Sequence, residues 1–211
     1  MGTALLLVLA GYLAGSIPFG YWLVRVVRGQ DIRRLGSGNI GGTNVWRSFG
    51  ARFGLPVVLF DIMKGFVPAL VASLTHGSLV AVLAGAAAML GHWRPLFMRF
   101  RRGGKLVATC GGAVFGIAPL VAVVGLAVWG LVFLAGRYAS LASILAALSL
   151  VPAALLLGED LSVVIFMAAG ALAIIWLHRA NIARLAHGEE HRFQLWHRWR
   201  KTVGSPQAHT R

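Results

Sequence analysis

Acidic side chains and cysteine are both scarce in this chain. Only six of its 211 residues are Asp or Glu, and charged residues of both signs make up 12%, about half the usual share of a soluble protein. The single cysteine, Cys110, excludes an intrachain disulfide and a cysteine-rich metal cluster. Together with the 58% of apolar residues, this composition also excludes a disordered chain, a collagen-like rod and a coiled coil.

Apolar and basic residues are what the chain has in excess. A soluble fold of this size has too much surface for its volume to hide so many apolar side chains, so a polytopic membrane protein is expected. The 20 Lys and Arg residues give a net charge of +14, which fits nucleic acid, anionic lipid or an anionic substrate. Nucleic acid is the poorest of these three partners because no separate soluble module is present to bind it.

Uncharged stretches define the expected membrane spans, each of which needs about 20 mostly apolar residues. Residues 1–24 form a first span that we expect to be retained, 53–93 hold two spans divided by a turn at 75–78, and 138–158 and 161–178 are two more. Residues 106–136 are uncharged for 31 positions, longer than one upright helix requires and short for two. A break near Pro119 would give two short crossings.

The distribution of positive charge decides how often residues 106–136 cross, since Lys and Arg concentrate in cytoplasmic loops. Two crossings place 19 of the 20 basic residues on one side. We therefore predict an all-α protein with seven transmembrane helices, an external N-terminus and a cytoplasmic C-terminus. Residues 1–211 would form a single domain with cytoplasmic loops at 28–51 and 94–105. The basic tail 179–211, with Trp196 and Trp199, would anchor at anionic headgroups.

The first cytoplasmic loop is rich in glycine and small polar residues. Its glycines permit a close backbone approach to a ligand, so several N–H groups can turn inward as an anion-binding nest. Arg47 adds a planar guanidinium suited to phosphate. A flexible linker at a helix end is the alternative, but it would rarely combine so many amides and hydroxyls. The polar candidates in this loop are Ser37, Asn39, Thr43 and Asn44.

The second cytoplasmic loop offers a similar array just before a new span. Gly103 and Gly104 free the backbone, and Lys105 supplies a point charge at the positive end of the following helix. Orientation of the protein in the membrane accounts for Arg99, Arg101 and Arg102. It does not account for Gly-Gly-Lys at the start of a helix.

Three further pairs of polar residues lie near the expected spans. Asp61 and Lys64 share one face of a span, where they either neutralise each other or line a cavity, and both roles remain open. His178 and Asn181 also share a face at the cytoplasmic end of the last span and are candidates for orienting a polar substrate. Ser140 and Ser143, taken alone, are ordinary helix-start residues.

The motifs of several common mechanisms are missing. The sequence contains no His-x4-Asp acyltransferase box, no HExxH zinc motif and no Gly-x-Ser-x-Gly elbow. Cys110 follows an uncharged stretch and is expected to pack rather than react. Two anion sites without a strong base indicate transfer chemistry on an already activated phosphate compound.

Short motifs along nearly the whole chain resemble those of the acyl-phosphate-dependent glycerol-3-phosphate acyltransferases of bacterial membranes. The chain differs from the usual pattern at Gly42, where Ala is common, and at Leu106, where a third Gly is usual. The motifs that carry the resemblance are Gly15–Gly20, Gly36–Asn44, Asp61-x-x-Lys64-Gly65 with Pro68, Gly91-His92 with Phe97 and Phe100, Gly103-Gly104-Lys105 with Thr109, and His178-x-x-Asn181.

The resemblance implies a reaction and a location. An acyl phosphate would donate its acyl group to the 1-hydroxyl of glycerol 3-phosphate, giving lysophosphatidate and inorganic phosphate at the start of phospholipid synthesis. No metal, cofactor or covalent acyl-enzyme is expected. The active site would face the cytoplasm from the bacterial inner membrane.

The resemblance also implies roles for the candidate residues. Ser37, Lys105, His178 and Asn181 would be catalytic, with Asn181 orienting the attacking hydroxyl. The donor's phosphate would be held by Ser37, Gly38, Asn39, Thr43 and Asn44. Glycerol 3-phosphate would be held by Arg47, Lys105, Ser143 and His178, with Gly103 and Gly104 beside Lys105. Possible supporting residues are Asp61, Lys64, His92 and Thr109.

Two other functions use the same features less well. An anion transporter would carry polar groups on both sides of its midplane, often in repeated halves, whereas these candidates gather on one side. A lipid-binding scaffold would explain the basic tail, but it would not explain Gly-Gly-Lys or the pairing of His178 with Asn181.

Overall fold

The computed structural model describes residues 2–193, and all regular secondary structure within this range is helical. This confirms the predicted all-α class. The elements are α1 (Gly2–Gly15), α2 (Phe19–Arg28), η1 (Ile32–Arg34), α3 (Gly42–Phe49), α4 (Ala51–His76), α5 (Ser78–Trp93), η2 (Leu96–Met98), α6 (Val107–Ile117), α7 (Pro119–Gly136), α8 (Ala139–Leu156), α9 (Leu161–Leu177) and α10 (Arg179–Ala186).

The expected first span is interrupted at Pro18. Helix α1 ends at Gly15 and α2 begins at Phe19, because proline lacks an N–H group and disfavours helical backbone in the residue before it. Helix α2 buries Gly20 and Val24 and carries basic residues in its last turn. The span expected over 1–24 is therefore made of two helices, which together are long and apolar enough to cross a membrane.

Helix α4 is the central element and packs against α1, α3, α5 and α6. Its contact with α6 depends on small residues. A methyl group at Gly65 would overlap the backbone of Thr109, and one at Gly112 would overlap the backbone of Ile62. Such close approach strengthens van der Waals packing, which is a main force between helices in a membrane. It holds the 11-residue α6 firmly against α4.

The break predicted near Pro119 is confirmed. Helix α6 ends at Ile117 and α7 begins at Pro119, where a missing N–H group is tolerated because the first helical N–H groups have no partner within the helix. The uncharged stretch 106–136 therefore forms two helices rather than one.

Five described helical segments are long and apolar enough to cross a membrane, with α1 and α2 counted together. Helices α9 and α10 form a sixth if they are counted as one span bent by 60°, and α6 is a shorter apolar helix. Large apolar side chains such as Leu59, Leu126 and Leu134 are exposed on the outside of the bundle, as lipid contact requires. The total of seven spans remains a prediction.

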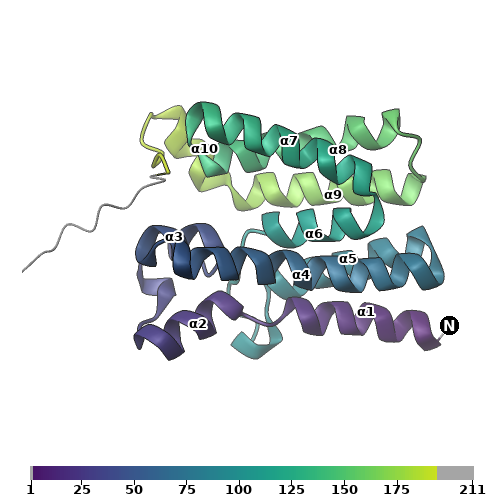
Figure 1. The fold of residues 1–211 in the computed structure, drawn as a ribbon, viewed down its shortest axis with the longest axis horizontal. Helices are drawn as coiled ribbons and strands as arrows, with labels where there is room; N and C mark the ends of the chain where they lie inside the picture. Colours follow the sequence, from purple (N-terminus) through teal and green to yellow (C-terminus); the bar gives the residue numbers. More distant parts are fainter. Residues whose placement is uncertain (1, 194–211) are drawn as a thin grey trace, which may run out of the picture.

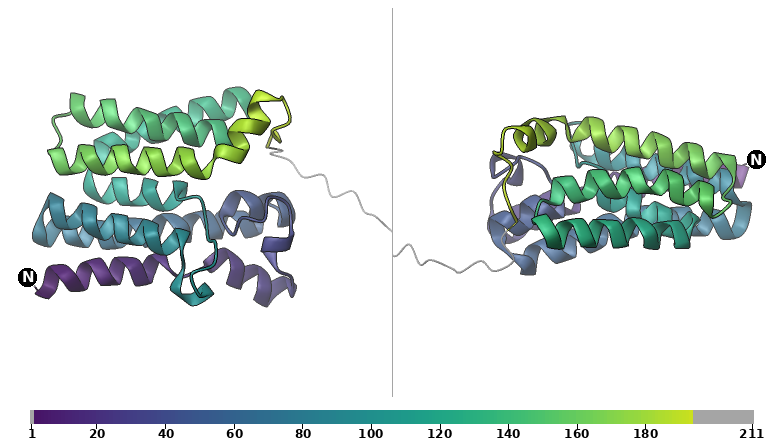
Figure 2. Two further views of the ribbon diagram at one scale, coloured as in Figure 1. Left: turned by 180° about the vertical axis from the view of Figure 1, so that it is seen from behind. Right: turned by 90° about the horizontal axis from the view of Figure 1, so that it is seen from above.

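The expected cytoplasmic segments meet at one end of the bundle. Helices α2, α3 and α10 lie at the end away from the N-terminus (Figure 1, Figure 2). The contact between α3 and the segment after α10 is direct, since the Arg47 guanidinium donates a hydrogen bond to the His191 carbonyl oxygen at 3.1 Å. Residues more than a hundred positions apart are thus brought together.

The first cytoplasmic segment is more ordered than the predicted loop 28–51. It contains η1 and the helix α3, which begins after extended backbone at Gly41. Gly42 permits the helix because a larger residue there would overlap the Val58 side chain of α4. Residues 42–49 of the expected loop are therefore helical for a tertiary reason.

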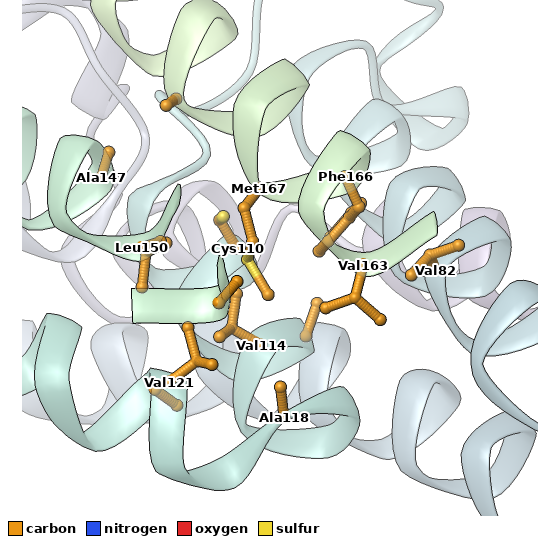
Figure 3. Close-up of a cluster of buried hydrophobic side chains, with 14 of the residues drawn as sticks. Val82, Cys110, Val114, Ala118, Val121, Ala147, Leu150, Val163, Phe166 and Met167 are labelled. Carbon is orange, nitrogen blue, oxygen red and sulfur yellow. The ribbon is translucent and has the colours of Figure 1, made fainter. Parts of the chain in front are cut away.

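Cys110 lies in the main apolar core between α6, α8 and α9 (Figure 3). It is 2% exposed and is grouped there with Val114, Leu150 and Met167. This confirms that Cys110 packs in the core. The predicted tail anchor at Trp196 and Trp199, with Arg198, Arg200 and Lys201, lies outside the described residues.

Candidate active site

Asn44 organises the glycine-rich segment from within. Its side chain is buried, and its Oδ1 accepts a hydrogen bond from the Ser37 N–H at 2.9 Å. Its Nδ2 donates to the carbonyl oxygens of Leu35 at 3.0 Å and Asn39 at 2.8 Å. Asn44 was expected to hold a phosphate through its side chain, but that amide is taken up by the loop and keeps the loop folded.

The segment presents other groups outward. Ser37 and Thr43 are exposed, and Gly38 has a φ of 70°, a left-handed conformation that favours glycine. Asn39 accepts a hydrogen bond from the Gly41 N–H at 2.7 Å, which shapes the turn into α3. Two exposed hydroxyls beside the N-terminus of α3 form an arrangement suited to an anion.

His92 and the backbone of α5 fix the position of Lys105. Gly103 donates its N–H to the Trp93 carbonyl oxygen at 2.8 Å, and Gly104 donates to that of His92 at 3.0 Å. A side chain at Gly104 would overlap the His92 imidazole. The two glycines are therefore required for the chain to pass close to His92 and to place Lys105 beside Asn181.

Leu106 follows Lys105, at the position where the resemblance implies a third glycine. Its φ is 72°, in the left-handed region. For a residue with a Cβ, this backbone conformation is less stable than the right-handed one by roughly 1–2 kcal/mol. Its side chain is 5% exposed and belongs to the same core cluster as Cys110. Burying a leucine contributes about 1.5–3 kcal/mol, so the burial offsets the backbone strain.

Lys105 is half-buried and donates a hydrogen bond to Asn181 Oδ1 on α10. Burial lowers the pKa of Lys105 to about 8, and the positive charge of Arg184 contributes to the shift. The Lys105 ammonium group therefore loses its proton at a lower pH than it would in water. A bound phosphate would restore the charged form.

Glu190 fixes the orientation of Asn181. Its Oε1 accepts hydrogen bonds from Asn181 Nδ2 and Ser140 Oγ, both at 2.7 Å, and its Oε2 accepts from Arg184 Nε at 2.8 Å. Burial raises the pKa of Glu190, but these three hydrogen bonds together hold it below its usual value. Because an ionised carboxylate only accepts hydrogen bonds, Asn181 must turn its NH2 group to Glu190 and its oxygen toward Lys105.

The sequence interpretation missed Glu190. It lies beyond the predicted motif, in a segment without regular structure after α10. The available signal was compositional, since acidic residues are rare in this chain and this one lies in a basic tail. The same contacts bring Ser140, taken as an ordinary helix-start residue, into the network.

Arg47 lies beside this network, on the helix that follows the glycine-rich segment. Its guanidinium is 5.9 Å from the centroid of the Phe193 ring. Burial lowers the pKa of Arg47, while the negative charge of Glu190 opposes the shift. Arginine remains charged in proteins, so Arg47 and Lys105 form a pair of half-buried cations at one site.

His178 lies at the bend between α9 and α10 and is buried. Its Nδ1 is 2.8 Å from the Ile174 carbonyl oxygen, which can only accept, so Nδ1 carries the proton and Nε2 is left as an acceptor. The predicted contact of Ser143 with glycerol 3-phosphate stays a prediction. The Ser143 hydroxyl donates to the Ala139 carbonyl at 2.6 Å and accepts from Trp129 Nε1 at 3.2 Å.

The possible supporting residues are buried between the helices. Lys64 Nζ and Asp61 Oδ1 form an ion pair of 2.7 Å, and His92 Nδ1 lies 3.7 Å from the same oxygen. Thr109 is fully buried on α6, and its hydroxyl has no hydrogen-bond partner among the described residues. Within residues 2–193, no group of three His, Cys, Asp or Glu side chains lies close enough together to hold a metal ion.

Sequence comparisons agree with each other along almost the whole chain. The profile of a family described as Glycerol-3-phosphate acyltransferase matches residues 5–188. The glycerol-3-phosphate acyltransferase of Aquifex aeolicus (strain VF5) is 47% identical over 194 residues, which cover 90% of this chain and 99% of that protein. The protein of the same name from Desulforamulus reducens is 41% identical over 189 residues, covering 89% and 94%.

Two solved structures share the fold. Both are of PlsY (YgiH), described as an integral membrane glycerol 3-phosphate acyltransferase. Its glycerol 3-phosphate form has a TM-score of 0.87 at 44% identity and covers 91% of this chain and 96% of that one. Its lysophosphatidic acid form has a TM-score of 0.83 at 42% identity, with coverages of 92% and 96%.

Proposed function

The chain belongs to the glycerol-3-phosphate acyltransferase family, and we propose that it transfers an acyl group from acyl phosphate to the 1-hydroxyl of glycerol 3-phosphate. The products are lysophosphatidate and inorganic phosphate, and the reaction begins phospholipid synthesis. The observation that carries the proposal is the hydrogen-bonded chain Lys105–Asn181–Glu190 beside Arg47. Arg47 and Lys105 supply two cations that can bind a phosphate, and Asn181 beside them supplies an oriented amide that can bind a hydroxyl.

Glycerol 3-phosphate binds through its phosphate to Arg47 and Lys105. The planar guanidinium offers two parallel donors to the phosphate oxygens, and the ammonium adds a point charge. His178, with Nδ1 protonated, offers Nε2 as an acceptor for a glycerol hydroxyl. The similarity to a structure of the glycerol 3-phosphate form of an acyltransferase supports glycerol 3-phosphate as the molecule that receives the acyl group.

Asn181 orients the attacking hydroxyl. In the structure, its Oδ1 accepts a hydrogen bond from Lys105. When the phosphate draws the ammonium away, Oδ1 becomes available to accept from the 1-hydroxyl, and Glu190 keeps the amide from flipping. Holding the nucleophile in an attack geometry can supply several kcal/mol of the rate enhancement.

The donor's phosphate occupies the segment from Gly36 to Asn44, at the N-terminus of α3. Ser37 and Thr43 donate hydroxyl hydrogen bonds, and the first N–H groups of α3 face the same anion. The 1-hydroxyl oxygen attacks the carbonyl carbon, the bond from that carbon to the phosphate oxygen breaks, and the hydroxyl proton passes to a phosphate oxygen. The activated donor needs only positioning and charge stabilisation.

The site faces the cytoplasm from the bacterial inner membrane in this proposal. The single domain 1–211 crosses seven times, with α6 as a short crossing and the N-terminus outside. Helices α2, α3 and α10, which carry basic residues in their last turns, lie at one end of the bundle (Figure 1), and this supports the orientation. A transporter is not supported, since the relatives carry the acyltransferase name and the described polar site lies at one end.

The choice of donor is the part of the proposal that an assay tests directly. Purified protein in detergent is expected to release inorganic phosphate from acyl phosphate only when glycerol 3-phosphate is added, and to give no product from acyl-CoA. Phosphate release is followed colorimetrically, and lysophosphatidate by mass spectrometry. Equal turnover with acyl-CoA, or no turnover with either donor, would contradict the proposal.

A further inference from the structure

A buried polar group lies between the two phosphate-binding segments. Asp61 and Lys64 on α4 are 3% and 9% exposed, and His92 on α5 is 3% exposed. None of the three belongs to the Lys105–Asn181–Glu190 network. Ionisable groups are expensive at membrane depth and are usually functional there, so this group requires an explanation.

The group lies close to both phosphate-binding segments. A Cβ built at Gly41, in the first segment, would lie 3.9 Å from Asp61 Oδ2. The imidazole of His92 packs against Gly104 in the second segment, and the His92 carbonyl oxygen accepts the Gly104 N–H at 3.0 Å. Asp61 Oδ2 thus lies near Gly41, while Asp61 Oδ1 pairs with Lys64 and has the His92 imidazole nearby, without a hydrogen bond to it.

Lys64 extends the same group to the break in the first span. Its Nζ donates a hydrogen bond to the Ile17 carbonyl oxygen at 3.3 Å, next to Pro18, where α1 gives way to α2. The link between α1 and α2 is therefore tied to α4 by a hydrogen bond, and His92 of α5 lies beside the same ion pair.

Stability alone does not account for these charges. Two well-packed apolar residues often replace a buried ion pair without loss of stability, whereas removing only one partner is strongly destabilising. The helices are also held together by the close glycine contacts between α4 and α6. What an apolar pair would not reproduce is a carboxylate beside Gly41 and His92 together with the hydrogen bond from Lys64 to the Ile17 carbonyl oxygen.

We propose that Asp61, Lys64 and His92 are positioning residues that fix the distance between the phosphate-binding segments 36–44 and 103–105. None of them touches substrate. Their effect on the rate rests on the proposed function, because transfer requires the carbonyl carbon held by one segment to lie within about 3–3.5 Å of the hydroxyl held at the other. Each segment binds its own phosphate without their help.

The test removes both charges together in the double variant Asp61→Leu/Lys64→Met. We expect a thermal midpoint close to that of the unmodified protein, a kcat at least 30-fold lower, and KM values for both substrates within threefold. The matched control is Leu59→Met/Met63→Leu, two exposed residues of the same helix, with unchanged kcat. An unchanged kcat in the double variant would overturn the proposal, since a pair that only fastens helices is replaceable.

A second measurement does not depend on catalysis. Spin labels on Arg34→Cys and Arg101→Cys, both exposed positions beside the two segments, in a Cys110→Ala background report the distance between them. The distribution is expected to broaden or shift when the double substitution is added, and an unchanged distribution would overturn the proposal. If the double variant does not fold, His92→Gln replaces it in both measurements with the same criteria. Unmodified protein that shows no turnover would refute the proposed function, while the label distances would still test the positioning role.

Discussion

Asn181→Ala is expected to lower kcat by about 10²–10³ while changing the KM for glycerol 3-phosphate by less than about threefold. In the proposed mechanism, Arg47 and Lys105 hold the phosphate of glycerol 3-phosphate, and the substitution leaves both in place. What is lost is the amide oxygen that aligns the 1-hydroxyl, and this interaction matters most in the transition state. An effect confined to kcat is the signature of such a loss.

The neighbouring Ile182→Ala separates this effect from damage to α10. Ile182 is 39% exposed on the same helix, and its replacement should leave kcat within twofold. Steady-state kinetics with both substrates varied, together with thermal unfolding in detergent, make the comparison. A kcat for Asn181→Ala equal to that of the unmodified protein would remove Asn181 from the mechanism.

Lys105→Met is expected to raise the KM for glycerol 3-phosphate by about two orders of magnitude, since hydrogen bonds between charged partners contribute roughly 1.5–3 kcal/mol each. Lys105→Arg should rescue little, because the guanidinium is wider than the ammonium and the glycines before Lys105 fix its approach. Arg101→Met, at an exposed position in the same loop, is the matched control. Unaltered glycerol 3-phosphate binding by Lys105→Met in calorimetry would refute the assignment.

Lys105 also predicts a pH dependence. Its pKa is lowered to about 8, so the free enzyme loses the ammonium charge as the pH rises through that value. The KM for glycerol 3-phosphate should therefore increase above pH 8 and level off below it. In Lys105→Arg the increase should disappear from this range, whatever the absolute activity, because arginine stays protonated. If the KM for glycerol 3-phosphate still rose above pH 8 in Lys105→Arg, the titrating group would not be Lys105.

The sequence predicted one of the two breaks that proline makes in the expected spans. The uncharged run 106–136 divides at Pro119 as predicted, and Asp61 and Lys64 form the ion pair that their spacing allows. The break at Pro18 and helix α3 were missed. A run of glycines predicts a loop, and only the packing of Gly42 against Val58 shows that a helix fits there.

The sequence proposed candidate site residues but not the contacts between them. Lys105 and Asn181, 76 positions apart, do meet. An asparagine that binds a ligand and one that binds its own backbone look the same in a sequence, and Asn44 is of the second kind. Glu190 depends on Ser140 and Asn181 coming together from different helices, which no local pattern encodes.

The most direct test of the account is the structure of a ternary complex with glycerol 3-phosphate and a non-hydrolysable acyl phosphonate. We predict the phosphonate at Ser37 and Thr43 and the acceptor's phosphate between Arg47 and Lys105. The 1-hydroxyl oxygen should then lie about 3–3.5 Å from the carbonyl carbon, which is the separation of a near-attack geometry. Two ligands bound far apart, or opening toward opposite faces of the bilayer, would contradict direct transfer between them.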